Sequence, residues 1–378
     1  MSKARDIADI GDGSGLTGIV IPPIHDPVAV TGATPSLDVG SYNYFNQGDI
    51  TADTTLTFAS VPTNANWRYT FSTTIVDGLW DVTTSSLSAS LSVTAQESSP
   101  QGMFFKPDGT KMYVTGSTGD DVNEYDLSTA WDVTTATFLQ SFSVAGQDTS
   151  PYEVFFSSDG IYMYMTGGIV KHLHQYTLST AWDISTASFT RSFDSTATTA
   201  TPQGVYFTSD GLSLYMVDSA GDEVNQYSLS TAWNISTITW VRLFSVSAQE
   251  ALPLCVHFKP DGTKMYVGGA TTDSINEYTL STAWDISTAT YLQAFSTAAQ
   301  EVNPHGVFFK PDGSKMYVTG NASVAVTEYN VGTSAILTLP AALQNTPPTP
   351  LIIGKTITYE FLTDDAGVTV TLISEEIV

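Results

Sequence analysis

Short apolar runs separated by polar turns fill most of the chain, and one pattern of them returns every 51 residues. In one unit the segments cover residues 102–106, 111–115, 122–125 and 138–142, the third of them alternating polar and apolar residues, with Asp108-Gly109 between the first two. Runs of this length, rich in aromatic and β-branched residues, predict strands, and an Asp-Gly pair between two of them predicts a tight hairpin. No stretch has a period near 3.6, so no amphipathic helix is predicted.

The 51-residue period is kept by four residue classes without an insertion: a proline, an Asp-Gly pair, a tyrosine and a tryptophan. The tryptophans are Trp80, Trp131, Trp182, Trp233 and Trp284. A repeat of about 40–50 residues with four short strands is the signature of a β-propeller blade. The repeat therefore predicts an all-β protein built from blades.

The number and offset of the strands predict how the ring closes. Five sets of three strands follow one another, and the first of five fourth strands, at about residues 87–94, precedes the first set. We predict a closed five-bladed propeller at residues 76–332, in which this early strand completes the last blade. Such a one-plus-three closure removes open strand edges. An open solenoid is the alternative, but it would need distinct caps.

The flanks of the propeller carry weaker signals. Residues 41–75 and 333–378 contain alternating strand patterns, and ring closure brings their inner ends together. We predict that they form one small split β domain into which the propeller is inserted. Residues 1–40 are rich in Gly, Pro and Ile, and are either a flexible tail or an extended docking arm that orders on a partner.

Charge and composition exclude several function classes. The 378 residues include 38 Asp and Glu but only 13 Lys and Arg, a net charge of -25, which disfavours nucleic acids and anionic membranes. The single cysteine, Cys255, excludes an intrachain disulfide framework. No apolar run approaches the roughly 18 residues of a membrane span. Residues 1–7 lack the apolar core of a secretory signal, so we expect synthesis in a cytoplasm without export by a signal peptide.

Several segments resemble a known group of proteins. The unit at residues 309–318, Phe-Lys-Pro-Asp-Gly-Ser-Lys-Met-Tyr-Val, resembles the YVTN-type propeller repeat of surface and virion proteins. The linker at 280–288 and the two ends, 1–11 and 368–378, resemble parts of tailed-phage tail-fibre-like proteins. The resemblance implies a virion protein, present as a homo-oligomer or in several copies. Its implied partners are other virion proteins and a host surface glycan.

One face of the predicted propeller is more diverse than the other, and it is the candidate for an asymmetric binding site. The loops between the second and third strands vary between repeats, whereas the loops that carry the tryptophans are nearly constant. The unusual residues on the diverse face are Tyr152, Lys171, His172, His174 and His305. Glu153 stands where three other repeats have glycine, near the channel. Each of these residues is either an ordinary loop residue or a ligand contact.

Two repeated features have alternative interpretations. The five tryptophans either fill grooves beside neighbouring blades or form five equal sugar-stacking sites. An acidic residue also precedes the repeated proline by three positions in four repeats, at Glu97, Asp148, Glu250 and Glu301, with Thr199 in the fifth. This set caps a local turn, binds Ca²⁺ or supplies an acid/base pair.

Three functions compete on these grounds. The first is a non-enzymatic phage virion protein of tail or fibre type whose propeller recognises a host cell-surface glycan and whose N-terminal arm anchors it. The second is a purely structural decoration or adaptor protein of the virion. The third is a glycan depolymerase. Acid/base catalysis needs two carboxylates in unlike environments, which near-identical repeats do not provide, so we expect no enzymatic activity and no cofactor unless Ca²⁺ binds the acidic set.

Overall fold

The chain divides into two compact units, one of residues Val76–Thr333 and one formed by Met1–Ile75 together with Ser334–Val378. The computed structural model describes residues 79–332 with their side chains and, in the other unit, the backbone of strands between residues 28 and 74 and between 337 and 377. Among these described residues, no helix is long and apolar enough to cross a membrane.

Strands from both ends of the chain share one sheet in the smaller unit. The sheet has the order β1-β3-β6-β28-β29, in which β6 and β28 are antiparallel. Its strands are β1 (Val28–Val30), β3 (Tyr44–Gln47), β6 (Arg68–Thr74), β28 (Thr356–Thr363) and β29 (Val370–Ile377). Two further pairs join β2 (Ser36–Asp38) to β5 (Thr57–Ala59) and β4 (Thr54–Thr55) to β27 (Leu337–Thr338). Except for β1 and β2, the docking arm predicted at residues 1–40 lies outside the described residues.

The larger unit consists of five four-stranded antiparallel sheets, which are the blades. Blade 1 contains β8 (Pro100–Phe105), β9 (Lys111–Gly116), β10 (Asp121–Leu127) and β11 (Ala136–Ser143). Blade 2 contains β12 (Pro151–Phe156), β13 (Tyr162–Gly167), β14 (His172–Leu178) and β15 (Ala187–Asp194). Blade 3 contains β16 (Pro202–Phe207), β17 (Ser213–Asp218), β18 (Glu223–Leu229) and β19 (Ile238–Ser245). Blade 4 contains β20 (Pro253–Phe258), β21 (Lys264–Gly269), β22 (Ser274–Leu280) and β23 (Ala289–Ser296).

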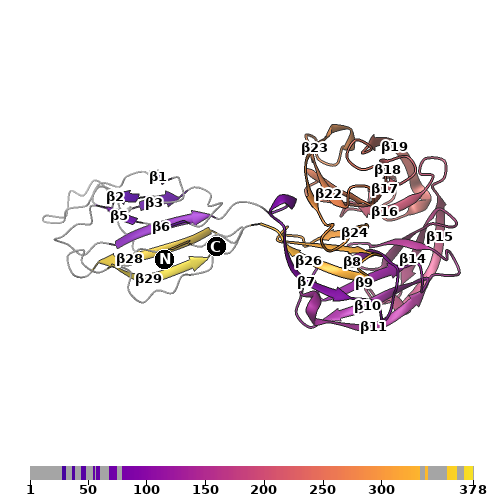
Figure 1. Cartoon of the computed structure of the whole chain (residues 1–378), viewed down its shortest axis with the longest axis horizontal. Helices are drawn as coiled ribbons and strands as arrows, with labels where there is room; N and C mark the ends of the chain where they lie inside the picture. Colours follow the sequence, from indigo (N-terminus) through magenta and orange to yellow (C-terminus); the bar gives the residue numbers. More distant parts are fainter. Residues whose placement is uncertain are drawn as a thin grey trace. The chain divides into compact units, whose positions relative to one another are not determined.

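Blade 5 closes the ring with a strand from the other end of the repeat array. It contains β24 (Pro304–Phe309), β25 (Lys315–Gly320), β26 (Ala325–Asn330) and the early strand β7 (Ser86–Ser92). Figure 1 shows β7 beside β26, and the two are paired antiparallel from Ala325 opposite Ser92 to Asn330 opposite Ser86. The first strand of each blade contacts the first strands of both neighbours, so these strands surround the central channel. The prediction of a closed five-bladed propeller is confirmed.

Within each blade, the tryptophan indole packs directly against the glycine of the hairpin. Gly109 and its four equivalents have φ between 69 and 77°, which glycine adopts without strain. The five tryptophans also have positive φ, between 62 and 67°, an uncommon conformation for a bulky residue. The Trp131 indole lies where a Cβ on Gly109 would be, so any side chain there would displace it. Tertiary packing therefore holds the tryptophan backbone in this conformation.

A hydrogen bond across each blade boundary uses the same two residue types. The Tyr113 hydroxyl in blade 1 donates to the carbonyl oxygen of Trp182 in blade 2 at 2.6 Å. The other four boundaries repeat this bond at 2.6–2.7 Å, including the two that join blade 5 to its neighbours. Burial raises the pKa of Tyr113, so its hydroxyl remains a donor at neutral pH. These bonds tie the blades into one rigid ring.

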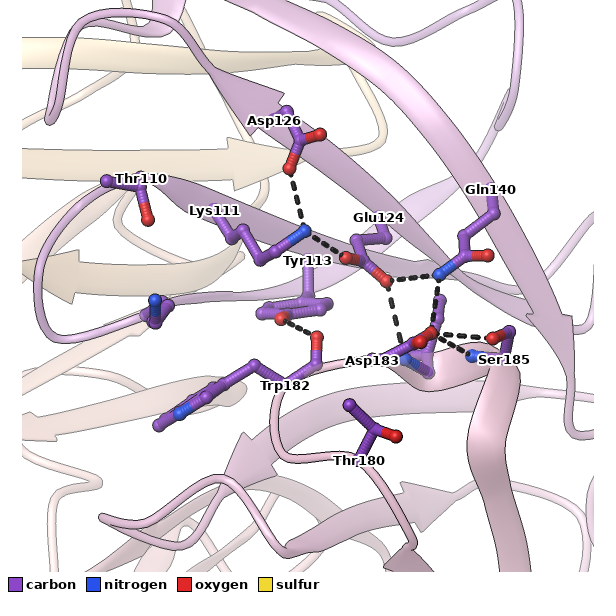
Figure 2. Close-up of polar contacts among 12 residues, drawn as sticks. Thr110, Lys111, Tyr113, Glu124, Asp126, Gln140, Thr180, Trp182, Asp183 and Ser185 are labelled. Atoms are coloured by element: carbon purple, nitrogen blue, oxygen red, sulfur yellow. Dashed lines mark hydrogen bonds and ion pairs between the residues drawn. The ribbon is translucent and has the colours of Figure 1, made fainter.

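A buried carboxylate strengthens the boundary between blades 1 and 2, as Figure 2 shows. Glu124 on β10 pairs with Lys111 at 2.5 Å, and its other oxygen accepts from the Gln140 amide at 2.9 Å and from the backbone N–H of Ile184 at 3.4 Å. Ile184 opens the short 3₁₀ helix η3 (Ile184–Thr186) that follows Trp182. The equivalent helices are η1 (Val82–Thr84), η2 (Val133–Thr135), η4 (Ile235–Thr237) and η5 (Ile286–Thr288).

Candidate functional site

Five aromatic side chains form a closed ring inside the channel, one from the first strand of each blade. They are Phe104, Phe155, Tyr206, His257 and Phe308, spaced 51 residues apart. Neighbouring rings around the circle have centroids 5.0 to 5.5 Å apart and meet edge to face. Such pairs add about 0.5–1.5 kcal/mol each beyond the area they bury. We call these five residues the aromatic ring.

A cavity of about 200 Å³ lies on the outer side of the aromatic ring, at the propeller face that carries the hairpins such as Asp108-Gly109. We call this face the hairpin face. The cavity is lined by the aromatic ring, by a second set of aromatic residues that follow it in sequence, and by the indoles of Trp233 and Trp284. The lining is therefore almost wholly apolar, which is typical of a site that binds a small organic molecule.

The rim of this cavity differs between blades. In blades 1, 4 and 5 a Lys-Pro pair precedes the hairpin, and Lys106, Lys259 and Lys310 each pair with the aspartate two positions on, at 2.7–2.8 Å. In blades 2 and 3 the exposed serines Ser158 and Ser209 take the place of the proline and line the cavity. The lining thus offers serine hydroxyls on one side and prolines on the other, and the lysines that precede these prolines are charge-neutralised.

The opposite face, which we call the loop face, carries the variable connections such as residues 117–120. There the channel ends at Gln101, Tyr152, Gln203, Leu254 and His305, with Glu153 beneath them. These side chains leave no cavity large enough for a water molecule. Between them and the aromatic ring a void of about 10 Å³ borders Glu153, room for at most one water. A ligand therefore has more space on the hairpin face.

The structure brings three of the predicted site residues together and leaves two apart. Tyr152, Glu153 and His305 meet at the loop-face end of the channel. Glu153 is buried, and its Oε1 accepts a hydrogen bond from the backbone N–H of Val154 at 3.1 Å. Burial raises the pKa of Glu153 well above its usual range and lowers that of His305 to about 4. Both groups are consequently biased towards their neutral forms.

His172 and His174 lie on β14, the third strand of blade 2, and not in the channel. The His174 ring is buried and shares a hydrogen bond of 2.9 Å with the Ser192 hydroxyl, while its Nε2 has no partner. Burial lowers the pKa of His174 to about 4. The His172 Nε2 lies 3.8 Å from Asp194, a contact on the blade surface. The two histidines share one face of the strand, as their spacing suggests.

The predicted acidic set binds backbone amides. Glu97 accepts from the N–H groups of Ser99, Thr118 and Gly119 at 2.6 to 3.3 Å. Asp148, Glu250 and Glu301 make the equivalent bonds in blades 2, 4 and 5. These N–H donors occupy carboxylate lone pairs that a cation would otherwise use. Among the described residues, no group of three His, Cys, Asp or Glu side chains is placed to hold a metal ion.

The tryptophans are packed between blades, and only part of the set reaches the cavity. Trp80 and Trp131 are buried, and Trp131 stacks on Phe105 of its own blade and on Phe308 of blade 5, with ring centroids 5.6 and 6.3 Å apart. Trp182, Trp233 and Trp284 are half-buried, and the last two line the cavity. The five positions are thus unequal in their access to a ligand.

The aromatic ring was missed by the sequence interpretation, although a signal for it exists. Both residues of the Phe-Phe pair at 104–105 are aromatic in every repeat, whereas only one residue of each pair can pack between the blades. Alternation along a strand sends neighbouring side chains to opposite sides. The first residue therefore points into the channel and the second into the boundary between blades.

Fold and cavity together place the chain in the class of five-bladed β-propellers. No family model matches the sequence, and no curated protein matches it. Solved structures do resemble it. The periplasmic gluconolactonase of Pseudomonas aeruginosa is 13% identical, with 74% of this chain and 72% of that chain covered and a TM-score of 0.38. A provisional 6-phosphogluconolactonase of Bacteroides uniformis is 12% identical, with coverage of 77% and 90% and a TM-score of 0.40.

A third similar structure, a protein of unknown function from Desulfotomaculum acetoxidans, is 12% identical, with coverage of 73% and 69% and a TM-score of 0.39. The expectation of a protein without enzymatic activity is contradicted by this comparison, because structures named as sugar lactonases are among the similar ones. At these identities and TM-scores the likeness assigns no activity to this chain. None of the comparisons supports the resemblance to phage proteins.

Proposed function

We propose that this protein recognises a carbohydrate and that the cavity on the hairpin face holds one sugar ring of a surface glycan. The observation that carries the proposal is the aromatic lining of that cavity at the centre of the hairpin face. Sugars present C–H groups on the faces of their rings and hydroxyls at the edges. An aromatic floor with a hydroxyl-bearing rim is complementary to both.

The size of the cavity supports one ring and not a long oligosaccharide. Its volume of about 200 Å³ is below the roughly 300–1,000 Å³ of pockets that enclose a drug-sized ligand. The remainder of a glycan would extend from the cavity across the hairpin face. There Ser158 and Ser209 offer hydroxyls beside the opening.

Aspartates next to these serines add acceptors for sugar hydroxyls. Oδ1 of Asp159 accepts from the Ser157 hydroxyl and the backbone of Ile161, and Oδ1 of Asp210 binds equivalently in blade 3. In both residues the second oxygen has no hydrogen-bond partner among the described residues. In blades 1, 4 and 5 that oxygen binds the lysine instead.

Rigidity favours recognition by this site. The five Tyr–Trp hydrogen bonds and the closed ring hold the cavity walls in place before a ligand arrives. Preorganisation reduces the ordering cost that binding would otherwise incur. Because the walls come from all five blades, no single loop has to move to complete the site.

The biological setting that we propose is the virion of a tailed phage. Its support is the sequence resemblance of the repeat and of the two chain ends to tail-fibre-like proteins. In that setting other virion proteins are the structural partners, residues 1–40 anchor the protein, and a host surface glycan is the ligand. Several copies on one particle would raise the avidity of weak single-ring contacts.

The test is binding of the purified full-length protein to a glycan array, followed by titration of the best ligand by calorimetry. Phe155→Ala removes one wall of the cavity and is expected to weaken binding at least tenfold. Tyr152→Leu is the matched control, because Tyr152 lies on the same strand β12 but at the loop-face end of the channel, and it leaves affinity within twofold. Equal affinity of Phe155→Ala and wild type would overturn the assignment of this cavity.

The same incubations are assayed for released sugar and for products of ring-opening, since the protein class includes enzymes. Binding is the result that the recognition function predicts. Turnover that Phe155→Ala abolishes would add catalysis at the same cavity to recognition. If no glycan binds and none is changed, the proposed function is wrong, and the structural virion role is the one to pursue.

A further inference from the structure

His257 is the one member of the aromatic ring with unused hydrogen-bonding groups. Its counterparts Phe104, Phe155 and Phe308 have none, and the Tyr206 hydroxyl donates to the carbonyl oxygen of Phe258 at 3.3 Å. The His257 imidazole makes ring contacts only, the closest with Tyr206 and Phe308 at centroid distances of 5.1 Å. It forms no hydrogen bond with any described residue, although it is 7% exposed.

The His257 ring nitrogens are not among the fully buried polar atoms that lack a partner, so they keep access to solvent and are free to bond a ligand. Phenylalanine fits at this place in three of the other four blades, so packing does not require histidine. The His257 ring lines the cavity on the hairpin face. A ligand in that cavity is therefore in position to take up the hydrogen-bonding capacity that the protein leaves unused.

The charges around the cavity argue against an anionic ligand. Burial lowers the pKa of His257 to about 3, so the ring is neutral and offers one donor and one acceptor. Lys106, Lys259 and Lys310, which precede the prolines of the cavity lining, are each paired with an aspartate. The net charge of -25 further disfavours a carboxylate-bearing sugar.

We propose that His257 determines the specificity of the hairpin-face cavity by hydrogen-bonding a hydroxyl of an uncharged sugar. The inference rests on the proposed function. It names the ligand class, which is neutral hexoses in preference to uronic or sialic acids, and the residue that selects this class. The aromatic floor binds the C–H face of the sugar, and the imidazole distinguishes a hydroxyl from an apolar group at the ring edge. A site built to hydrogen-bond a hydroxyl discriminates strongly against ligands that lack it.

The test compares binding of methyl glucoside, methyl galactoside and methyl glucuronoside by ligand-observed NMR, with benzene as an apolar probe of the same cavity. His257→Phe installs the residue that three other blades already carry, so the fold should be retained, which thermal unfolding checks. Its affinity for the preferred neutral glycoside is expected to fall about tenfold, the loss of one good hydrogen bond. Its affinity for benzene should change less than twofold, because aromatic surface replaces aromatic surface.

His305→Leu is the matched control. It removes a second largely buried histidine that also forms no hydrogen bond with a described residue, at the other end of the channel, and installs the residue found at Leu254. Its glycoside affinity should equal that of wild type. A parallel loss of glycoside and benzene binding in His257→Phe would reveal a structural role and overturn the inference.

The outcomes separate this inference from the proposed function. If wild type binds a neutral glycoside and His257→Phe binds it equally well, the proposed function stands, but His257 does not determine specificity and the inference is wrong. If wild type prefers the glucuronoside, the neutral class is wrong. If wild type binds benzene but no glycoside, the recognition function itself fails and the inference falls with it.

Discussion

Asp218 supplies in blade 3 the carboxylate that Glu97 supplies in blade 1. The two residues belong to different strand positions, yet both accept hydrogen bonds from the same two repeat-equivalent amides, those of Thr201 and Ala220 in blade 3 and of Ser99 and Thr118 in blade 1. The position of Asp218 is glycine in every other blade, and a Cβ on Gly116 would collide with the Glu97 carboxylate. One carboxylate site is thus filled from either of two places in the sequence.

This exchange predicts a compensating pair of substitutions. Asp218→Gly removes the acceptor of three backbone N–H groups and is expected to lower the free energy of unfolding by about 2 kcal/mol. Thr199→Glu alone forces two carboxylates together and is also destabilising. The double variant recreates the arrangement of the other blades and should return to within about 0.5 kcal/mol of wild type. Urea unfolding of all four proteins measures the coupling, and additive losses would contradict the exchange.

The tyrosine at each blade boundary is predicted to stabilise the ring through its hydroxyl. Tyr113→Phe leaves the Trp182 carbonyl oxygen without its donor and should cost about 1–2 kcal/mol of unfolding free energy. Tyr125→Phe is the control, because that hydroxyl lies 3.5 Å from the Gln96 amide oxygen, at the limit of a hydrogen bond. Its loss should cost less than about 0.5 kcal/mol. Equal costs in chemical denaturation would show that the boundary bonds do not contribute.

The two carboxylates that bind Lys111 are predicted to contribute unequally. Glu124 is 1% exposed and its oxygens also serve Gln140 and Ile184, whereas the Asp126 side chain is 48% exposed. Removing one partner from a buried pair is strongly destabilising, so Glu124→Gln should cost about 2 kcal/mol. Solvent screens the exposed pair, and Asp126→Asn should cost less than about 1 kcal/mol. Thermal unfolding distinguishes the two, and a reversed order would refute the role assigned to burial.

Glu153 is predicted to make the stability of the wild type fall as pH rises. Burial raises its pKa in the folded protein above the unfolded value of about 4.3. Below that value both states hold the proton and there is no penalty. As pH rises, the unfolded state releases the proton first, and stability falls until the folded pKa is passed.

The matched variant is Glu153→Gln, whose amide oxygen can still accept from the Val154 N–H. Its stability advantage over wild type should be small at pH 4 and grow by up to about 1.4 kcal/mol per pH unit above that. Unfolding curves of both proteins between pH 4 and 8 provide the measurement. A constant difference across this range would mean that the carboxyl ionises freely in the folded state.

The sequence by itself determined the blades, their number and the closure of the ring. These follow from spacing, because Pro, Asp-Gly, Tyr and Trp recur at 51 residues and each recurrence marks one local unit. The early strand that completes blade 5 was predictable for the same reason. Strand count and strand order can be derived from the sequence alone, without knowing how far apart residues lie in space.

Tertiary structure decided which residues meet at the centre. His257 and Phe308 are 51 residues apart and touch only because five first strands close around one channel, whose radius no local pattern specifies. In the sequence, Thr199 interrupts the acidic set. In the structure, the carboxylate of Asp218, 19 residues further on, occupies that site from another strand. Tyr152 and His305 meet at one end of the channel while His172 stays outside it. Periodicity reports where a residue stands in its repeat, but side-chain direction and ring closure determine what it contacts.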